Sequence, residues 1–343
     1  MNHFLRRFPR VPVALMISVC ISGSALAQDP KTPGPAPGSA TAPGSASPVE
    51  LKQQPAVRSE SATQQMILSA TRAGRRIVAV GDHGNVLLSD DEGRSFRQAK
   101  AVPTRATLTS VSFADSKNGW AAGQWGVILN TSDGGETWKM QRSETAVDRP
   151  LFSILFIDKD HGWAVGLWSL MLETHDGGRT WVIVKVPSPP EGGKGDRNLF
   201  QLFADSKGSL FVAAERGVVL RSDDKGGTWS YLSTGYNGSF WTGTALKDGT
   251  LIVAGLRGSV YRSVDDGKTW TPAKSENKSS ITDLEVVGNK LYGVGLDGVT
   301  IQSADDGASF TMKQRDDRLA LTSIVVTESG KVIEFSKRGP VVE

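Results

Sequence analysis

The chain has 343 residues, of which 38% are hydrophobic and 22% are charged, and its formal net charge is +3. Residues 1–27 contain three arginines and no acidic residue, so the remaining 36 basic residues equal the 36 acidic residues of the chain. The excess positive charge therefore belongs to the N-terminus. The rest of the chain has no net charge, so its charge gives no support to binding of nucleic acid or of a membrane surface.

Residues 1–27 have the organisation of an export signal. Three arginines form a basic start, residues 11–21 are apolar but too few to span a bilayer, and Ala25-Leu26-Ala27 fits a small-residue cleavage site. We expect cleavage after Ala27. The mature protein is then periplasmic or otherwise exported, with no segment inserted in the membrane.

A short linker follows the signal. Residues 28–48 are mainly Pro, Ala, Gly, Ser and Thr, a composition that cannot bury enough surface to offset its ordering entropy. The single cysteine, Cys20, lies inside the signal after Val19, which is larger than a lipid-attachment motif accepts. We therefore expect no lipidation, disulfide or thiol chemistry in the mature chain, and one large domain over residues 49–343.

One eight-residue phrase occurs six times in that domain: Ser or Thr, any residue, Asp, any residue, Gly, any residue, Thr or Ser, and an aromatic. The closing aromatics are 42, 43, 48, 41 and 40 residues apart. A period in this range is typical of a radial array of four-stranded units, because each unit exposes an apolar face that only a neighbour can cover. The closing aromatics are Phe96, Trp138, Trp181, Trp229, Trp270 and Phe310.

The residues before each phrase repeat a second pattern. An apolar strand such as residues 108–113 is followed by a small-residue strand such as residues 119–123 and a third strand such as residues 126–130. Short runs of Val, Ile, Leu and Trp between Gly and Asp turns indicate an all-β fold. Trp120 and Trp163 lie inside the second strands, and we expect both to be core residues.

A seventh unit begins at residues 321–326 and continues through residues 331–336 and 338–342, but it has no phrase and no fourth strand. Residues 49–54 precede the first unit and belong to none. We predict that they supply the missing outer strand and close the ring, which removes two exposed edges. The predicted architecture is a seven-bladed β-propeller of four-stranded antiparallel blades.

The repeated phrase has the chemistry of a hairpin turn. Its aspartate can accept backbone N–H bonds, its glycine supplies a positive φ, and its hydroxyl groups cap neighbouring backbone groups. A calcium loop needs a longer ligand spacing and a distal glutamate, and both are absent from every copy. The three histidines beyond the signal do not have the spacing of metal ligands, so we expect no metal and no cofactor. The aspartates assigned this structural role are Asp91, Asp133, Asp176, Asp224, Asp265 and Asp305.

Residues 118–123, 126–129 and 131–138 together resemble the BNR, or Asp-box, repeats, and residues 161–181 are just as close. More narrowly, they resemble the photosystem II stability/assembly factor family and its bacterial relatives. The resemblance extends over essentially the whole of residues 49–343. It implies an exported, non-enzymatic binding factor, monomeric, that helps to assemble a membrane complex. Its expected partner is a membrane protein, such as a complex subunit or a transporter.

In a four-stranded blade, the turn between the second and third strands lies on the face opposite the Asp-boxes, together with the connections between blades. Three connections carry an Asp-Arg pair in register, at residues 148–149, 196–197 and 317–318. Two interpretations are open: these pairs hold blades together locally, or the arginines bind an acidic peptide or carboxylate while tryptophans anchor it. The candidate binding residues are Arg149, Arg197, Arg216, Arg257, Arg318, Arg338, Trp125 and Trp168.

A glycoside hydrolase of the sialidase type is the alternative, because it also uses an arginine cluster on this face. Sialidases also contain Asp-box repeats like those of this chain. Their reaction, however, needs a tyrosine beside a glutamate, and their sequences carry an Arg-Ile-Pro motif. Here Ile77 is followed by Val78, and Tyr236 has no adjacent glutamate. The carboxylates that an enzyme would have to pair are Asp82, Glu215 and Asp297.

Overall fold

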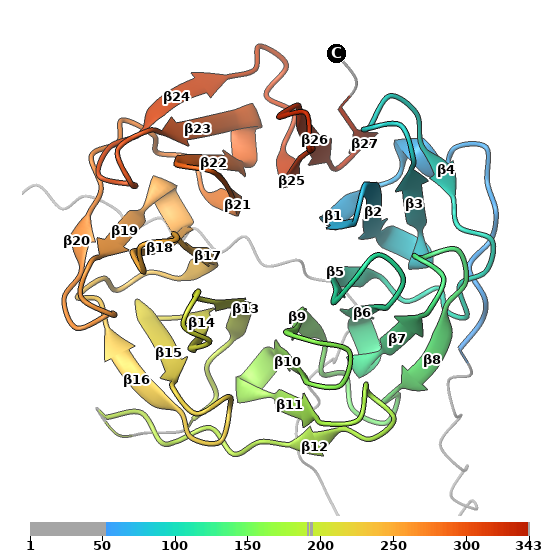
Figure 1. Ribbon diagram of the computed structural model, residues 1–343, viewed down its shortest axis with the longest axis horizontal. Helices are drawn as coiled ribbons and strands as arrows, with labels where there is room; N and C mark the ends of the chain where they lie inside the picture. Colours follow the sequence, from blue (N-terminus) through green and yellow to red (C-terminus); the bar gives the residue numbers. More distant parts are fainter. Residues whose placement is uncertain (1–52, 191, 193–194, 342–343) are drawn as a thin grey trace, which may run out of the picture. The chain divides into compact units, whose positions relative to one another are not determined.

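The computed structural model describes residues 53–190, 192 and 195–341. These residues form seven antiparallel sheets that follow one another around a ring in chain order (Figure 1). The predicted seven-bladed β-propeller is therefore confirmed. The predicted signal, the linker and residues 49–52 lie outside the described part. Within that part, no helix combines the length and the apolar character that crossing a membrane requires.

The first four blades have four strands each. Blade 1 contains β1 (Ile67–Ala73), β2 (Arg76–Gly81), β3 (Val86–Ser89) and β4 (Arg97–Gln98), and blade 2 contains β5 (Leu108–Phe113), β6 (Gly119–Gly123), β7 (Ile128–Thr131) and β8 (Lys139–Arg142). Blade 3 contains β9 (Leu151–Phe156), β10 (Gly162–Gly166), β11 (Met171–Thr174) and β12 (Val182–Ile183), and blade 4 contains β13 (Leu199–Ala204), β14 (Leu210–Ala214), β15 (Val218–Ser222) and β16 (Ser230–Ser233).

Blade 5 contains β17 (Phe240–Ala245), β18 (Leu251–Gly255), β19 (Val260–Ser263) and β20 (Thr271–Pro272), and blade 6 contains β21 (Ile281–Val287), β22 (Lys290–Gly295), β23 (Val299–Ser303) and β24 (Thr311–Gln314). Blade 7 has β25 (Leu321–Val326), β26 (Val332–Ser336) and β27 (Gly339–Pro340). Short 3-10 turns are η1 (Ala62–Gln64), η2 (Asp82–Gly84), η3 (Gln124–Gly126), η4 (Leu167–Ser169), η5 (Leu256–Gly258) and η6 (Leu296–Gly298).

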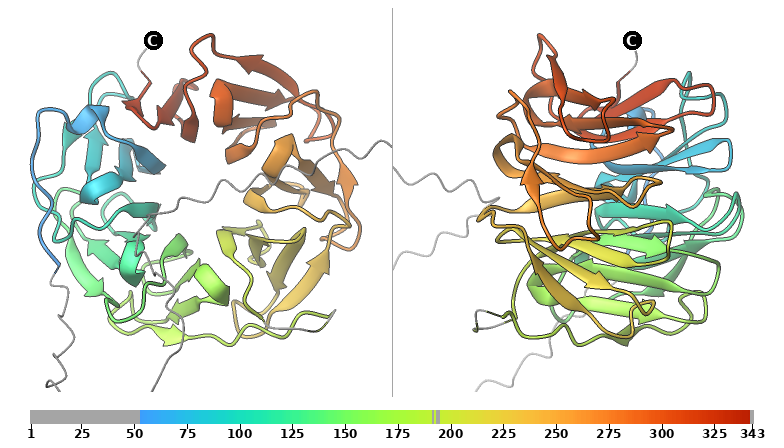
Figure 2. Two further views of the ribbon diagram at one scale, coloured as in Figure 1. Left: turned by 180° about the vertical axis from the view of Figure 1, so that it is seen from behind. Right: turned by 60° about the vertical axis from the view of Figure 1, so that its left-hand side comes forward.

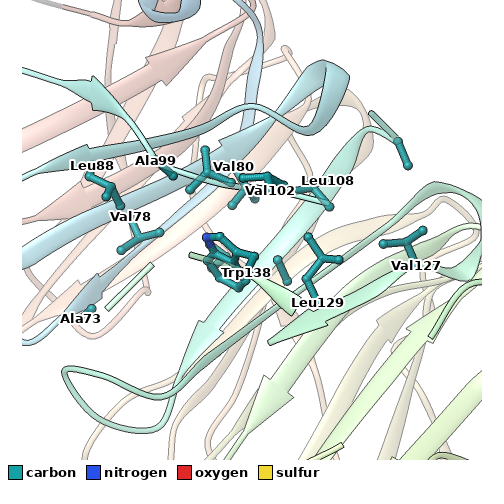
Figure 3. Packing of buried hydrophobic residues seen from close by; sticks show 14 residues of the cluster. Ala73, Val78, Val80, Leu88, Ala99, Val102, Leu108, Val127, Leu129 and Trp138 are labelled. Atoms are coloured by element: carbon teal, nitrogen blue, oxygen red, sulfur yellow. The ribbon is translucent and has the colours of Figure 1, made fainter. Parts of the chain in front are cut away.

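The core lies between adjacent blades. Trp138, which closes an Asp-box in blade 2, packs with Val78, Val80 and Leu88 of blade 1 in one buried cluster (Figure 3). Its indole N–H donates to the carbonyl of Gly135 at 2.9 Å. Trp120 and Trp163 are 2% and 1% exposed, as predicted for core residues. Each blade thus buries its apolar face against a neighbour, so that neighbouring blades stabilise one another.

Each inner strand carries a register irregularity at its second residue, next to the connection from the preceding blade. In β5, for example, Leu108 pairs with Gly123 and Ser110 pairs with Ala122, so that Thr109 bulges out of the ladder. A bulge re-aims the extra side chain, here at one end of the central channel. The seven bulge residues are Leu68, Thr109, Phe152, Phe200, Trp241, Thr282 and Thr322.

The predicted closure by an N-terminal outer strand is wrong for its described residues. Blade 7 has three strands, and Gln53 and Gln54 belong to no strand. Gln53 instead accepts a hydrogen bond from the Thr104 hydroxyl at 2.5 Å, so this segment follows the boundary of blades 1 and 2. At the edge of β27, Gly339 (φ +92°) lies so close to the Thr63 carbonyl that η1 takes the place predicted for the strand.

The ring closes through its inner strands. The first and last blades lie side by side in Figure 1 and, seen from behind, in Figure 2. The Thr322 hydroxyl donates to the Ile67 carbonyl at 2.6 Å, and the Ala70 N–H donates to the Ser323 hydroxyl at 3.1 Å. These bonds join β25 to β1 and therefore replace the predicted strand exchange as the closing contact.

Candidate functional site

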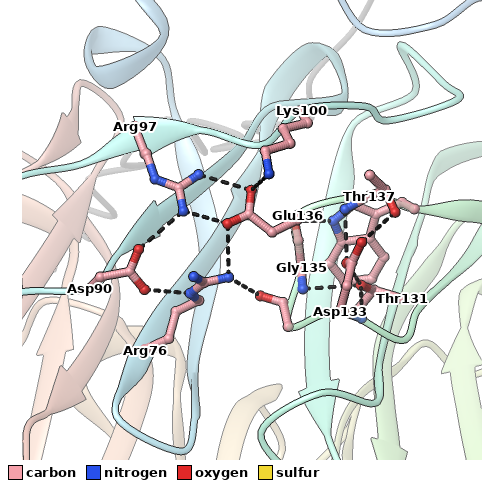
Figure 4. Close-up of polar contacts among 11 residues, drawn as sticks. Arg76, Asp90, Arg97, Lys100, Thr131, Asp133, Gly135, Glu136 and Thr137 are labelled. Carbon is pink, nitrogen blue, oxygen red and sulfur yellow. Dashed lines mark hydrogen bonds and ion pairs between the residues drawn. The ribbon is translucent and has the colours of Figure 1, made fainter.

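The Asp-box face is built of self-satisfied turns. In blade 2, Asp133 accepts from the Thr131 hydroxyl at 2.7 Å and from the Thr137 N–H and hydroxyl at 2.9 and 2.6 Å, and the Gly135 N–H donates to the Thr131 hydroxyl (Figure 4). The equivalent aspartate–hydroxyl and aspartate–backbone bonds occur in the other five boxes. Both carboxylate oxygens are thus used within each turn.

These bonds keep the box aspartates ionised. Hydrogen bonds from the side chain and backbone of Thr269 lower the pKa of Asp265 to about 2, and those from Ser309 lower the pKa of Asp305 to about 2. A carboxylate held at so low a pKa is a poor general acid or base near neutral pH. The box face therefore provides architecture rather than chemistry.

Charged side chains join boxes of adjacent blades. Glu136 of the blade 2 box contacts Arg76 and Arg97 of blade 1, and Lys100 approaches it at 3.7 Å (Figure 4). Hydrogen bonding to Arg97 lowers the pKa of Glu136 despite partial burial. Asp90 completes the network by accepting from both arginines.

The opposite face, which we call the loop face, carries the turns between the second and third strands and the connections between blades. In six of these turns a residue other than glycine adopts a positive φ: 54° at His83, 57° at Trp125, 52° at Trp168, 59° at Arg216, 57° at Arg257 and 58° at Asp297. Such residues are uncommon outside glycine, asparagine and aspartate, and strained positions cluster at functional sites. The repeat therefore holds one side chain at the same strained position in each of these turns, and all six except Trp125 are exposed.

A glycine after the strained residue lets the turn pack tightly. A side chain at Gly217 would meet the Tyr236 carbonyl, and one at Gly258 would meet the Asn277 carbonyl. Both carbonyls belong to the connections to the following blade. The loop-face turns are thus fixed by close backbone packing, on which the preceding side chain is displayed.

The predicted binding residues fall into two groups. Arg216, Arg257, Arg318 and Arg338 are exposed, and Trp168 is 53% exposed. The second group is held in the fold. It comprises Arg149, which is half-buried, Arg197, which is 3% exposed, and Trp125, which is half-buried against the apolar cluster of blades 1 and 2.

Arg149 and Arg197 each contact the blade that follows them in the chain. Arg149 donates to the Trp168 carbonyl at 3.4 Å, and the guanidinium of Arg197 lies 5.4 Å from the centre of the Tyr231 ring. Burial, together with the nearby Arg216, lowers the pKa of Arg197 below its ordinary value. Both arginines therefore help to hold the loop face in place and are less accessible to a ligand than the exposed arginines.

Two supporting residues were not predicted. Asn198 donates its N–H and its amide to Glu215 at 2.9 and 2.8 Å and accepts from the Trp168 N–H, which ties the turns of blades 3 and 4 together. Arg142 donates to the Gly126 carbonyl at 2.7 Å. Neither residue lies in a repeated motif, so the sequence pattern carries no signal for them.

The interpretation of the Asp-Arg pairs as local ion pairs can be compared with the observed contacts. Asp317 pairs with Arg315 at 3.1 Å, while Arg318 is exposed. Hydrogen bonding to Arg315 lowers the pKa of Asp317, and Arg338 adds to the effect from a distance. At blade 7, the exposed arginine is thus separate from the one that pairs with the aspartate.

The groups that a hydrolase would use are engaged elsewhere. The Tyr236 hydroxyl donates to the Leu256 carbonyl at 3.1 Å, and its ring packs against Phe240 and Tyr261. Glu215 is bonded to Asn198, while Asp82 and Asp297 accept the hydroxyls of Thr107 and Ser279. Among the residues that the structure describes, no group of three or more His, Cys, Asp or Glu could hold a metal ion.

Comparisons with known proteins agree with this architecture. This chain is similar in structure to YCF48 bound to D1 peptide (TM-score 0.66, 16% identity, covering 85% of this chain and 100% of that one) and to YCF48 from Cyanidioschyzon merolae (0.63, 16%, 81% and 94%). It is also similar to the WD40 β-propeller domain of Doa1 (0.62, 14%, 80% and 91%). At these identities the likeness establishes the fold.

The sequence comparison is more specific. No curated protein sequence matches the chain significantly. A family model described as photosynthesis system II assembly factor YCF48 matches residues 141–339, which is more than half of the chain and confirms the resemblance inferred from the repeats. The chain therefore belongs to the photosynthesis system II assembly factor YCF48 family.

Proposed function

We propose that this protein is an exported, non-enzymatic assembly factor whose loop face binds an acidic segment of a membrane-complex subunit. The observation that carries the proposal is the exposure of Arg216, Arg257, Arg318 and Arg338 on one face, together with Trp168. Loops held on a rigid scaffold are where binding residues concentrate. On the box face, the repeated aspartates are used within their own turns.

The exposed residues have complementary chemistry. A guanidinium donates two parallel hydrogen bonds to a carboxylate, which gives both affinity and orientation. An exposed tryptophan contributes apolar area near such contacts, as in the energetic centres of protein interfaces. In this proposal Arg149, Arg197 and Trp125 keep the turns in place, and the direct contacts come from the exposed group.

The family supports a protein partner. One solved relative is described as bound to a D1 peptide, which is a statement about that protein. By analogy, we propose that this chain also takes a peptide segment of a membrane-complex subunit and acts as a monomer. A non-enzymatic role is favoured because Tyr236 and Glu215, the groups that a sialidase-type reaction would need, are bonded within the fold.

Export is part of the proposal and rests on residues 1–27. Cell fractionation followed by N-terminal sequencing tests it. We expect periplasmic protein that begins at Gln28. Full-length protein retained in the cytoplasm would contradict export without bearing on the loop face.

The binding proposal is tested by capture of partners from solubilised membranes of the source organism. The triple variant R216E/R257E/R318E is expected to lose a membrane protein that wild type captures. A matched triple variant on the box face, R94E/R179E/K268E, makes the same charge change and should retain it, since Arg94, Arg179 and Lys268 are exposed beside their boxes. Equal capture by wild type and the loop-face variant would refute the proposal.

A further inference from the structure

The loop-face end of the central channel contains a cavity of about 90 Å³. Residues of all seven inner strands line it, and each strand contributes its bulge residue or the residue next to it. We call this cavity the neck. It is distinct from the exposed arginines, which lie in the surrounding turns and connections.

The bulge residues make the neck asymmetric. In blades 2, 6 and 7 they are threonines, and each hydroxyl donates to the first carbonyl of the next inner strand: Thr109 to Leu151 at 2.7 Å, Thr282 to Leu321 at 3.0 Å and Thr322 to Ile67 at 2.6 Å. These three threonines are thus built into the ring. They form its polar side, which Leu68 of blade 1 interrupts.

Blades 3 to 5 place aromatic side chains at the same position. The rings of Phe152 and Phe200 are stacked, with centroids 5.7 Å apart and planes 19° apart, and Trp241 follows in the next blade. All three are half-buried and line the neck. One side of the neck is therefore an aromatic wall. A threonine at these positions could instead have donated a hydrogen bond to the next blade, as the threonines of blades 2, 6 and 7 do.

Below the bulges, side-chain oxygens connect neighbouring blades. Ser110 accepts the N–H of Ile154 and Ser153 accepts that of Leu202, at 3.1 and 3.0 Å. Asp283 occupies the equivalent position in blade 6 and accepts the N–H of Ile324 at 3.1 Å. Where blades 2, 3 and 7 use a serine for this bond and blade 4 a glutamine, blade 6 thus places a carboxylate in the neck.

The carboxylate of Asp283 has no cation beside it in the neck. Its remaining contacts are the Ser323 hydroxyl at 2.7 Å and the Leu284 N–H at 2.9 Å. No lysine, arginine or histidine occurs among the residues that line the cavity. Burial raises the pKa of Asp283 to about 6, as expected for a desolvated carboxylate without a charged partner.

We propose that the neck binds a primary ammonium group, the side chain of a lysine carried by the partner segment. The methylene stem of the lysine lies along Phe152, Phe200 and Trp241, and its ammonium group donates to Asp283 and to the hydroxyl oxygens of the neck. Aromatic faces attract cations, and a buried carboxylate is stabilised by one. An ammonium has three donors and matches a cavity lined by oxygen atoms.

This inference deepens the proposed function and relies on it only for the source of the lysine. The arginines of the loop face favour acidic residues, whereas the neck favours one basic residue between them. A partner that satisfies both must carry a lysine flanked by acidic residues. Such a pattern discriminates against segments that are only acidic, which the arginines alone would accept.

The neck can be tested without the partner. Nα-acetyl-lysine methylamide is titrated into the isotopically labelled mature chain, and the indole N–H of Trp241, assigned with the variant W241F, is followed by NMR. We expect saturable shifts at Trp241 and in neighbouring amides. The uncharged Nα-acetyl-norleucine methylamide is the matched probe and should bind about tenfold more weakly or worse, because it lacks the charge-assisted hydrogen bonds.

The variant D283S isolates the carboxylate, because serine accepts the equivalent inter-blade bond in blades 2 and 3. We expect a loss of affinity for the lysine probe of about tenfold or more. D297N, which alters a loop-face carboxylate outside the neck, should leave the affinity unchanged, and F200L should weaken it through the wall. Equal binding of both probes, unchanged binding by D283S, or no saturable shift would overturn the inference. Failure of the wild-type protein to capture any specific membrane partner, with intact probe binding, would instead count against the proposed function alone.

Discussion

Arg97 of blade 1 and Glu136 of blade 2 form a two-pronged ion pair across a blade boundary. The Nη1 atom of Arg97 donates to Oε2 of Glu136 at 3.0 Å, and Nη2 donates to Oε1. The Glu136 side chain is only 15% exposed, and Arg76 contacts it at 3.2 Å. The pair therefore differs from an ordinary surface salt bridge in its two-pronged geometry and in the burial of its carboxylate, although the Arg97 side chain is 46% exposed.

Glu136→Gln should destabilise the propeller by about 1–3 kcal/mol, because two arginines lose the charge that they share. The matched control is Glu328→Gln, whose exposed pair with Arg72 (3.3 Å) should be worth about 0.5 kcal/mol or less. Urea unfolding of both variants measures the difference. Equal effects of the two substitutions would contradict a special role for the pair.

The lowered pKa values of the box aspartates predict that the protein loses stability at acid pH. Hydrogen bonds from Ser95 lower the folded-state pKa of Asp91 to about 2, below its unfolded value of 3.8. The stabilisation is therefore present above about pH 4 and is lost as the pH falls towards 2. Asp91→Asn should lower the urea midpoint at pH 6 and flatten its decline between pH 4 and 2. A decline as steep as that of wild type would show that other groups control acid unfolding.

The repeat made the box face predictable from sequence, and the reason is locality. The bonds that Asp133, the Thr131 hydroxyl and the Trp138 indole make within the turn join residues at most four apart, so the eight-residue phrase contains both partners. The blade count followed from the same spacing. The N-terminal strand was wrong for its described residues, Gln53 and Gln54, because η1 lies at the edge of β27, a tertiary choice that no local pattern encodes.

The loop face was only partly predictable. Arg149, Arg197 and Arg318 have the same place in the sequence pattern, yet Arg197 is buried over Tyr231 while Arg318 is exposed. For Arg197, what lies beneath it belongs to the outer strand of the blade that follows, since Tyr231 is part of β16, and the sequence of this strand differs from blade to blade. The neck was missed for a related reason, since a bulge leaves no mark in the alternation of apolar residues.

The raised pKa of Glu285 predicts that the fold loses stability as the pH rises. Glu285 lies on β21, and burial, together with nearby Asp283, raises its pKa from 4.5 to about 7 although Arg72 opposes the shift. A raised carboxyl pKa favours folding while the group is protonated, so this stability is complete below about pH 4.5 and is lost as the pH rises through 7.

Glu285→Gln should therefore raise stability at pH 8 by about 1–3 kcal/mol while changing it little at pH 4. Asp283, whose pKa is also raised, leaves part of the pH dependence in the variant. Urea midpoints at pH 4, 6 and 8 measure the effect, with exposed Glu60→Gln as the control. If the variant is less stable than wild type at pH 8, the ionised Glu285 stabilises the fold, which would contradict the raised pKa.

The strained loop-face turns predict a conflict between stability and binding. Arg216 and Arg257 have φ values of 59° and 57°, a conformation that costs a residue other than glycine about 1–2 kcal/mol. Replacement of Arg257 by glycine relieves this cost but adds conformational entropy to the unfolded chain, so we expect a change between zero and about 1 kcal/mol of stabilisation. Arg338, which has no positive φ, is the control: its replacement by glycine should destabilise slightly.

Partner capture should move in the opposite direction, because Arg257→Gly removes a guanidinium from the loop face. Unfolding and capture measured on the same preparation separate the two effects. If Arg257→Gly lowers stability by more than Arg338→Gly does, then the arginine is held by contacts within the propeller, and its strained turn serves packing. If stability is kept and capture falls, the strain at Arg257 serves ligand binding and not the fold. The turn then folds equally well without the arginine side chain, and only binding needs it.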